Sequence, residues 1–236
     1  MERVEILYKC PELVVCVKPA GVLSQSGKGG GVHMVELLER QLGGSIYPVH
    51  RLDRETGGVM VYGRNSAAAA ELSRQIQQGQ MKKEYLAVLK GVPEKREGML
   101  EDILFHDSGR NKSYVVKKLR KGAKKARLCY RVLEDRDGTA LVQVRLFTGR
   151  THQIRVQFSS RGLPLRGDRV YGGGGGGLCL WACRLTLGLP DGSCRCFERI
   201  PEGLGGYTEI PPLVELDGEE EERGGEKSLD KPSSVQ

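Results

Sequence analysis

Strand-like segments outnumber helical segments in this 236-residue chain, and they follow one another in runs instead of alternating with helices. Each is a short apolar or alternating stretch that ends at turn-forming residues, as strands usually do. The predicted strands cover residues 6–8, 13–17, 83–89, 128–133, 140–147 and 178–187. The first two are predicted to pair as a hairpin. Consecutive strands of this kind favour an α+β fold with a mixed or mainly antiparallel sheet.

Three segments have the apolar spacing of helices, at residues 34–42, 66–78 and 151–160. The second has the clearest boundaries, because Asn65 and Ser66 are suitable N-caps and Gly79 suits the position after the last turn. In the third, Ile154 and Phe158 lie one turn apart. Three helices among so many strands agree with the α+β class.

Length and composition allow one substantial core and exclude several classes of protein. Hydrophobic residues make up 39% of the chain, and no apolar run approaches the roughly 20 residues that span a bilayer. Residues 1–5 do not begin a signal peptide. The seven cysteines are an odd number in a chain without an export signal. Reduced thiols and a cytoplasmic location are therefore predicted.

Charge is distributed unevenly along the chain. The formal net charge is +7, but residues 215–236 carry −5 and residues 1–214 carry +12. A body this basic indicates a polyanionic partner such as RNA or DNA, although a basic surface also aids solubility. Residues 215–236 are predicted to form a disordered acidic and polar tail, because they lack the apolar residues of a core. The glycine run Gly172 to Gly177 is predicted to be mobile without a partner.

Residues 50–58, with the sequence HRLDRETGG, place one carboxylate between two arginines in a glycine-rich turn. A lone Asp in a turn is usually a cap or a turn former. Asp53 has fixed positive charge on both sides, from Arg51 and Arg54, so it is also a candidate for an ionised nucleophile in a cleft.

A second cluster lies at residues 148–157, with the sequence TGRTHQIRVQ. We expect a helix whose first turn bears Arg150, Thr151 and His152, where free N–H groups and the helix dipole favour anions. Arg155 lies beside the predicted buried stripe and therefore needs an acidic partner, for which Asp53 is a candidate. The alternative is a surface arginine at the helix edge.

Two further features carry candidate chemistry. Tyr85 lies in the middle of a predicted strand, where a tyrosine either packs in the sheet or faces a cleft and stacks on a base. Residues 110–127 hold nine Lys or Arg and no acid. Such a run is often only a solvated face, but nine uncompensated charges repel one another unless phosphates neutralise them. Its basic residues are Arg110, Lys112, Lys117, Lys118, Arg120, Lys121, Lys124, Lys125 and Arg127.

Several other sites are not supported. Cys179, Cys183, Cys194 and Cys196 lack the paired spacing of a zinc ribbon, and the four histidines show no metal-ligand spacing. The glycine run lacks the Lys and Ser/Thr of a phosphate-binding Walker loop. We therefore predict no metal site.

Five motifs in a fixed order resemble those of the RluA-type RNA pseudouridine synthases. They lie at residues 6–21, 50–58, 83–87, 148–156 and 162–172. The resemblance covers about residues 5–190, and the two motifs that contain histidine are its specific part. The chain resembles the short members of this family, which lack an N-terminal S4 RNA-binding domain. The resemblance implies a catalytic domain at residues 1–214, with a mixed, mainly antiparallel central sheet flanked by helices and loops around an RNA cleft.

The resemblance also implies roles for individual residues. Asp53 matches the catalytic aspartate, Tyr85 the active-site tyrosine and Arg155 the basic residue paired with the aspartate. Arg51 matches the arginine that enters the space left by a flipped uridine. No metal or organic cofactor is implied. The other predicted RNA-binding residues are Arg54, Arg150, His152, Lys112, Lys117, Lys118, Lys121, Lys124 and Lys125.

The chain departs from the family pattern at a few positions. Thr56-Gly57-Gly58 replaces the usual Thr-Ser-Gly, and this change is expected to loosen the loop. Gln157 and Trp181 stand where histidine is frequent, and Leu189-Pro190 replaces His-Pro. None of these changes alters the matched Asp, Tyr or Arg, so they are expected to affect specificity more than chemistry.

The resulting hypothesis is an enzyme that isomerises uridine to pseudouridine in an rRNA or tRNA stem-loop, acting as a monomer without an obligate protein partner or a membrane. The alternative is a basic RNA-binding protein without catalysis, such as a ribosome-assembly factor. A hydrolase that uses Asp53 is a third reading, but it needs a second carboxylate, and only Glu55 lies nearby in the sequence.

Overall fold

The computed structural model describes residues 3–27 and 30–216 of the chain. The predicted tail lies outside the described residues from residue 217 onward. No described helix is long and apolar enough to cross a membrane.

Within the described residues, eleven strands form one sheet, along the order β1-β2-β4-β10-β5-β9-β8-β6-β7, with β3 paired to β4 and β11 to β10. The pairing of β4 with β10 is parallel, and the other pairings are antiparallel. The strands are β1 Glu5–Lys9, β2 Leu13–Lys18, β3 Tyr47–Pro48, β4 Gly57–Gly63, β5 Lys82–Lys90, β6 Glu97–Asp107, β7 Lys112–Val116, β8 Ala123–Arg136, β9 Thr139–Leu146, β10 Leu180–Gly188 and β11 Cys194–Glu198. The predicted α+β class with a mixed, mainly antiparallel sheet is confirmed.

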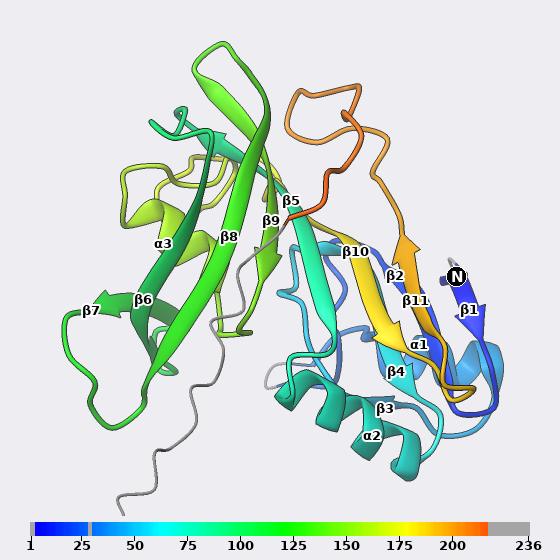
Figure 1. The fold of residues 1–236 in the computed structure, drawn as a ribbon. Helices are drawn as coiled ribbons and strands as arrows, with labels where there is room; N and C mark the ends of the chain where they lie inside the picture. The colour runs from blue at the N-terminus through cyan, green and yellow to red at the C-terminus, as the bar shows by residue number, and fades with distance from the viewer. Residues whose placement is uncertain (1–2, 28–29, 217–236) are drawn as a thin grey trace, which may run out of the picture.

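In the part of the chain that the structure describes, the sheet is accompanied by three helices, α1 Met34–Leu42, α2 Ser66–Gln77 and α3 Gln153–Ser159. In Figure 1, β5 crosses the middle of the molecule, with α1 and α2 beside β1–β4 and with α3 beside β6–β9. The predicted start of α2 is confirmed, because the Asn65 side chain accepts the Ala68 N–H at 2.8 Å. Gly79 follows the helix with a φ of +73°, the left-handed conformation that glycine adopts most readily.

The third helix is shorter than predicted. It begins at Gln153, and its N-cap residue His152 has a left-handed backbone with a φ of 56° and makes no side-chain capping bond. Arg150, Thr151 and His152 therefore precede the helix, so the predicted anion site in its first turn is wrong. All residues from Gln153 to Phe158 are buried. Arg155 consequently lies inside the protein and not at an exposed helix edge.

Both faces of the sheet are covered. Leu89 of β5 packs in the largest core cluster with Ile154 of α3, whereas Leu86, on the opposite face of the same strand, packs with Tyr207. The segment after β11 thus covers the second face. It remains packed through Leu216, which is buried and whose carbonyl accepts a hydrogen bond from Arg145 at 2.7 Å.

Two departures from the family pattern meet in one contact. A Cβ atom on Gly57 would lie 2.4 Å from the Trp181 ring, a distance that real side chains do not tolerate. Gly57 and Trp181 are also register partners in the parallel β4–β10 pairing. Gly57 therefore gives Trp181 its space, and the expectation of a loosened loop at this glycine is wrong.

The sequence reading did not predict strands β3, β4, β6, β7 and β11. Strand β4 is buried along its whole length and therefore shows no alternation. Strand β6 alternates poorly, because only Leu100 and Leu104 of its eleven residues are buried. Strand β8 begins at Ala123, five residues before the predicted start, inside the basic stretch. Charged side chains on partly exposed strands hide the alternation on which strand prediction depends.

Candidate active site

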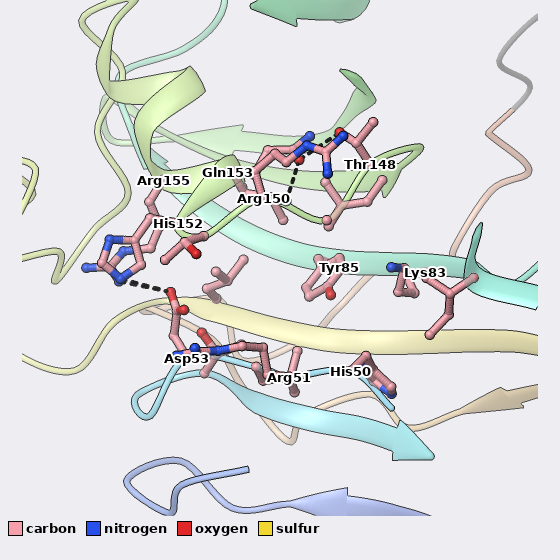
Figure 2. Close-up of a pocket in the computed structure, with 18 of the residues that line it drawn as sticks. His50, Arg51, Asp53, Lys83, Tyr85, Thr148, Arg150, His152, Gln153 and Arg155 are labelled. Atoms are coloured by element: carbon pink, nitrogen blue, oxygen red, sulfur yellow. Dashed lines mark hydrogen bonds and ion pairs between the residues drawn. The ribbon is translucent and has the colours of Figure 1, made fainter. Parts of the chain in front are cut away.

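A pocket of about 490 Å³ opens between the loop that follows β3, strand β5 and the segment that enters α3. Figure 2 shows side chains from these elements facing one another across it. Among the residues predicted from the sequence, the pocket is lined by Arg51, Asp53, Tyr85, Arg150, His152 and Arg155. Arg54 and the six predicted lysines are not among its lining residues.

The loop that carries Asp53 is held by short hydrogen bonds. The Ser24 hydroxyl accepts the Leu52 N–H at 3.0 Å and lies 3.0 Å from the Leu52 carbonyl oxygen, to which it donates. The Thr56 N–H donates to the Asp53 carbonyl at 3.1 Å and closes the turn. These bonds fix the backbone on both sides of Asp53, whose side chain remains 19% exposed.

Lys18 also supports this loop, and the sequence reading did not identify this role. Its buried ammonium donates to three carbonyl oxygens, those of Pro19, Val22 and Arg54, at 2.9, 2.6 and 3.1 Å. Burial lowers the pKa of Lys18 to about 8, against a smaller opposing effect of the Asp53 charge. The turn sequence Lys18–Gly21 was the available signal, because a lysine before such a turn can bond its carbonyls.

Arg155 joins two carboxylates. Its Nη1 donates to Asp53 Oδ2 at 2.9 Å, which confirms the partner expected from the sequence. Its Nε and Nη2 donate to Asp168 Oδ2 and Oδ1 at 2.7 and 2.9 Å. Although burial alone would lower the pKa of Arg155, the bonds to Asp168 and the charge of Asp53 raise it above its ordinary value. The guanidinium is therefore a permanent cation beside Asp53.

Asp168 is a site residue that the sequence reading left without a role. Its side chain is fully buried and also accepts the N–H groups of Val170 and Tyr171, at 2.9 and 3.1 Å. Burial would raise the pKa of Asp168, but the hydrogen bonds and charge of Arg155 outweigh it and lower the pKa. The signal was its place in the motif at residues 162–172, although no local pattern connects it to Arg155.

His152 lies between the carboxylate and the basic strand β7. Its Nδ1 is 3.1 Å from the Tyr171 hydroxyl, which accepts the Ser113 N–H of β7 at 2.7 Å. Its Nε2 is 3.7 Å from Asp53 Oδ2, beyond hydrogen-bond distance. Burial lowers the pKa of His152, although the Asp53 charge opposes this effect. The Tyr171 hydroxyl also lies 3.2 Å from the Ser113 carbonyl, to which it can donate, so its one proton is shared between this carbonyl and His152 Nδ1 as possible acceptors.

Tyr85 of β5 lines the pocket and shares the sheet face of the main core cluster. In Figure 2 the Tyr85 side chain extends from β5, to the right of Asp53 and above Arg51. Burial, followed by the charge of Asp53, raises the pKa of Tyr85 well above its ordinary value. The phenol therefore keeps its proton at neutral pH and offers the pocket an aromatic surface and a hydroxyl.

The sequence reading also missed Lys83 and His50, which line the same pocket. His50 Nε2 accepts the Val61 N–H at 3.2 Å, and burial, then the charge of Lys83, lowers the pKa of His50 to about 3. His50 is thus a neutral acceptor that ties the loop to β4. Burial and the charge of Arg150 lower the pKa of Lys83 as well.

The basic stretch lies on β7, on the start of β8 and on the turn between them, next to the pocket but not in its wall. Lys112 stands 5.3 Å from the centre of the Tyr171 ring. Arg150 connects the stretch to the pocket, because its Nε donates to the Lys125 carbonyl at 2.9 Å. The remaining predicted lysines, Lys117, Lys118, Lys121, Lys124 and Lys125, are exposed. Over residues 3–27 and 30–216, no group of three or more His, Cys, Asp or Glu could hold a metal ion.

Comparisons with known proteins agree with this geometry. The sequence model of the RNA pseudouridylate synthase family matches residues 12–160. Ribosomal large subunit pseudouridine synthase D of Nitrosomonas europaea is 39% identical over 174 residues, which cover 71% of this chain and 49% of the relative. The chain thus spans about half the length of that relative. Dual-specificity RNA pseudouridine synthase RluA of Escherichia coli is 37% identical over 170 residues, covering 70% of this chain and 76% of the relative.

The fold is also similar to a solved structure. Human RNA Pseudouridylate Synthase Domain Containing 1 superposes with a TM-score of 0.72 at 24% sequence identity, covering 86% of this chain and 85% of that chain. The family match includes the Asp53 loop, the Tyr85 strand and Arg155. The chain belongs to the RNA pseudouridylate synthase family.

Proposed function

We propose that the protein is an RNA pseudouridine synthase that isomerises a uridine in a structured rRNA or tRNA, with Asp53, Tyr85 and Arg155 as its catalytic residues. The observation that carries the proposal is the 2.9 Å bond between buried Arg155 and partly exposed Asp53, at the wall of a pocket that also contains Tyr85. The names of the two relatives describe one enzyme of the large ribosomal subunit and one of dual specificity.

The two oxygens of Asp53 have different surroundings. Oδ2 accepts the Arg155 hydrogen bond, whereas no hydrogen bond to Oδ1 is found within the described part of the chain. A carboxylate anchored through one oxygen keeps the other available to the substrate. The two first steps open to it, addition to C1′ and removal of the C2′ proton, both use Oδ1. Arg155 acts as the fixed cation that orients the carboxylate.

The rest of the reaction exchanges one bond for another. The C1′–N1 bond breaks, the uracil rotates within the pocket and a C1′–C5 bond forms; C5 then loses its proton and N1 gains one. The target nucleotide has to leave its stack first, at a cost of a few kcal/mol that contacts in the pocket offset. Exposed Arg51, at the rim, fills the space left in the RNA. The Tyr85 ring stacks on the detached base, and its phenol remains protonated.

A non-catalytic RNA-binding protein would have the same basic surface, but it gains nothing from a carboxylate fixed in its pocket, because that charge repels phosphate. A hydrolase would need a second carboxyl group as its acid. The nearest such group to Arg155 is Asp168, which is fully buried, doubly bonded to the guanidinium and has a lowered pKa. Asp168 is therefore not available as an acid, and the isomerase remains the better reading.

The test is Asp53→Asn, which preserves shape and removes the charge. Pseudouridine mapped in total RNA from cells with and without the protein identifies the target site. We expect the variant to form no pseudouridine at that site, while its Kd for the same RNA stays within about threefold of wild type. Pseudouridine formation by the variant would overturn the role of Asp53. An unmodified target in the presence of wild-type protein would overturn the proposed function.

A further inference from the structure

A second hollow, of about 720 Å³, lies at the end of β5 remote from the active-site pocket. Lys83 and Tyr85 line the first pocket, whereas Lys90 at the other end of the strand lines the second. Lys83 and Lys90 are seven positions apart, which corresponds to about 23 Å of extended chain. The lining of this second hollow comprises Lys90, Arg136, Asp137, Thr139, Arg166, Gly173, Gly174, Gly175, Gly205, Gly206 and Tyr207.

Three cations and one carboxylate, Asp137, face this hollow. Arg136 donates to the Gly206 carbonyl at 2.6 Å, and Arg166 donates to the Gly205 carbonyl at 2.8 Å. Each bond orients a guanidinium and leaves further N–H donors on the same group. Lys90 is exposed, and the described residues offer its ammonium no hydrogen bond or ion pair. Arg136 also lies 3.7 Å from a carboxylate oxygen of Glu134, and Asp137 lines the hollow. Lys90 and Arg166 are thus the cations of the hollow that have no ion pair among the described residues.

The glycine run forms one wall of the hollow, and its packing gives it a structural reason. Gly173 is buried, donates to the Asp168 carbonyl at 2.8 Å and accepts the Gly167 N–H at 3.1 Å. A Cβ at Gly173 would lie 1.7 Å from the Leu165 carbonyl oxygen, so only glycine fits there. The run, which was predicted to be mobile without a partner, thus has packing partners at Gly173.

Beyond this anchor the run presents bare backbone to the hollow. Gly172, Gly174 and Gly176 have φ values of 92°, 90° and 95°, which only glycine adopts readily. Gly174 and Gly175 are exposed, and no hydrogen bond of their N–H groups is found among the described residues. Turns of this kind expose successive N–H groups and form concave sites for anions.

We propose that this hollow is a phosphate subsite that holds the backbone of the RNA substrate at a distance from the reacting nucleotide. The proposal rests on the RNA substrate proposed above. Cations together with unshielded backbone N–H groups are the donors that phosphate oxygens prefer. A free phosphate ion has the same chemistry, so the test includes both sources.

The main variant is Lys90→Gln, with Lys9→Gln as its matched control, an exposed lysine on the edge strand β1. Binding of a fluorescently labelled tRNA transcript to the full chain is measured over a series of salt concentrations. We expect Lys90→Gln to raise Kd about three- to tenfold. The negative slope of log K against log salt should become shallower by about 0.7–0.9, because one phosphate contact is lost. Lys9→Gln is expected to change neither quantity.

Two further measurements keep the test decisive. Arg166→Gln, checked first for an unchanged Tm, should reproduce the effect of Lys90→Gln. In amide NMR spectra, the transcript should shift the signals of Gly174 and Gly175. Unchanged Kd and slope in both variants would overturn the proposal, as would glycine signals that respond to inorganic phosphate but not to the transcript. These readouts measure binding alone, so they are independent of whether wild-type protein forms pseudouridine.

Discussion

Arg155 donates two parallel hydrogen bonds to Asp168, of 2.7 and 2.9 Å, and only its third nitrogen, Nη1, donates to the proposed catalytic carboxylate of Asp53. Asp168 thus fixes the plane of the guanidinium, and that plane fixes the direction from which Asp53 is held. Bidentate Arg–carboxylate pairs add geometric specificity as well as energy. The residue that positions the site is therefore one that does not touch the pocket.

Asp168→Ala should cost both stability and activity. Removing one partner of a buried ion pair leaves an uncompensated charge, so we expect the free energy of unfolding to fall by about 3–5 kcal/mol. Loss of the guanidinium's orientation should lower kcat by about 10²-fold. Urea unfolding and single-turnover isomerisation measure the two effects. Glu71→Ala breaks the exposed pair with Arg74 and should cost no more than about 1 kcal/mol. A folded Asp168→Ala protein with wild-type kcat would contradict the positioning role.

Lys18 should make stability depend on pH in the alkaline range. Its pKa is about 8 in the folded protein and 10.5 ordinarily, so the unfolded chain binds more protons between these values. The contribution of a lowered pKa is complete above 10.5 and is lost as pH falls through 8. Relative to Lys18→Met, wild type should therefore gain about 3 kcal/mol between pH 7 and pH 11. The comparison, by urea unfolding, cancels the titration of other groups. A constant difference across this range would exclude a lowered pKa.

The Tyr171 hydroxyl connects β7 to His152, and Tyr171→Phe removes this connection alone. The buried Ser113 N–H would lose its acceptor, which should cost about 1–3 kcal/mol of unfolding free energy. His152 would lose the partner of Nδ1, so we expect kcat to fall while the Kd for RNA stays within about twofold. Tyr47→Phe, at an exposed tyrosine, is the control and should change neither. A loss of stability without any change in kcat would limit Tyr171 to a structural role.

Gly57 and Trp181 should behave as one unit in mutagenesis. Gly57→Ser places an atom against the indole ring and should cost about 1–3 kcal/mol by overpacking. Trp181→His, which restores the residue frequent in the family, vacates that space. The double variant should therefore lose less unfolding free energy than the two single variants together, with a coupling energy of about 1–3 kcal/mol. Thermal unfolding of the four proteins gives the coupling. Additive effects would show that Gly57 and Trp181 are not energetically coupled.

Much of the fold follows from local signals. Helix α1 begins at Met34 and ends at Leu42, as the apolar spacing predicts. Helix α2 begins at Ser66, directly after the predicted cap Asn65. The hairpin of β1 and β2 and the long strand β5 are also confirmed. Periodicity, caps and turn residues act within a few positions of one another, so a single sequence contains this information. Strands β6 and β7 were not predicted, because partly exposed strands with charged side chains do not show an alternation of apolar and polar residues.

The candidate site divides in the same way. The sequence offered Asp53 as a candidate partner of Arg155, because an arginine beside a buried stripe needs a carboxylate and residues 50–58 present one in a charged turn, and the structure shows this bond. Only the tertiary structure showed that Asp168 is the second partner, that Trp181 occupies the space of Gly57, and that the glycine run walls a basic hollow beside Lys90. These contacts join segments far apart in the chain, and packing across the sheet decides them, whereas local propensity acts only on near neighbours.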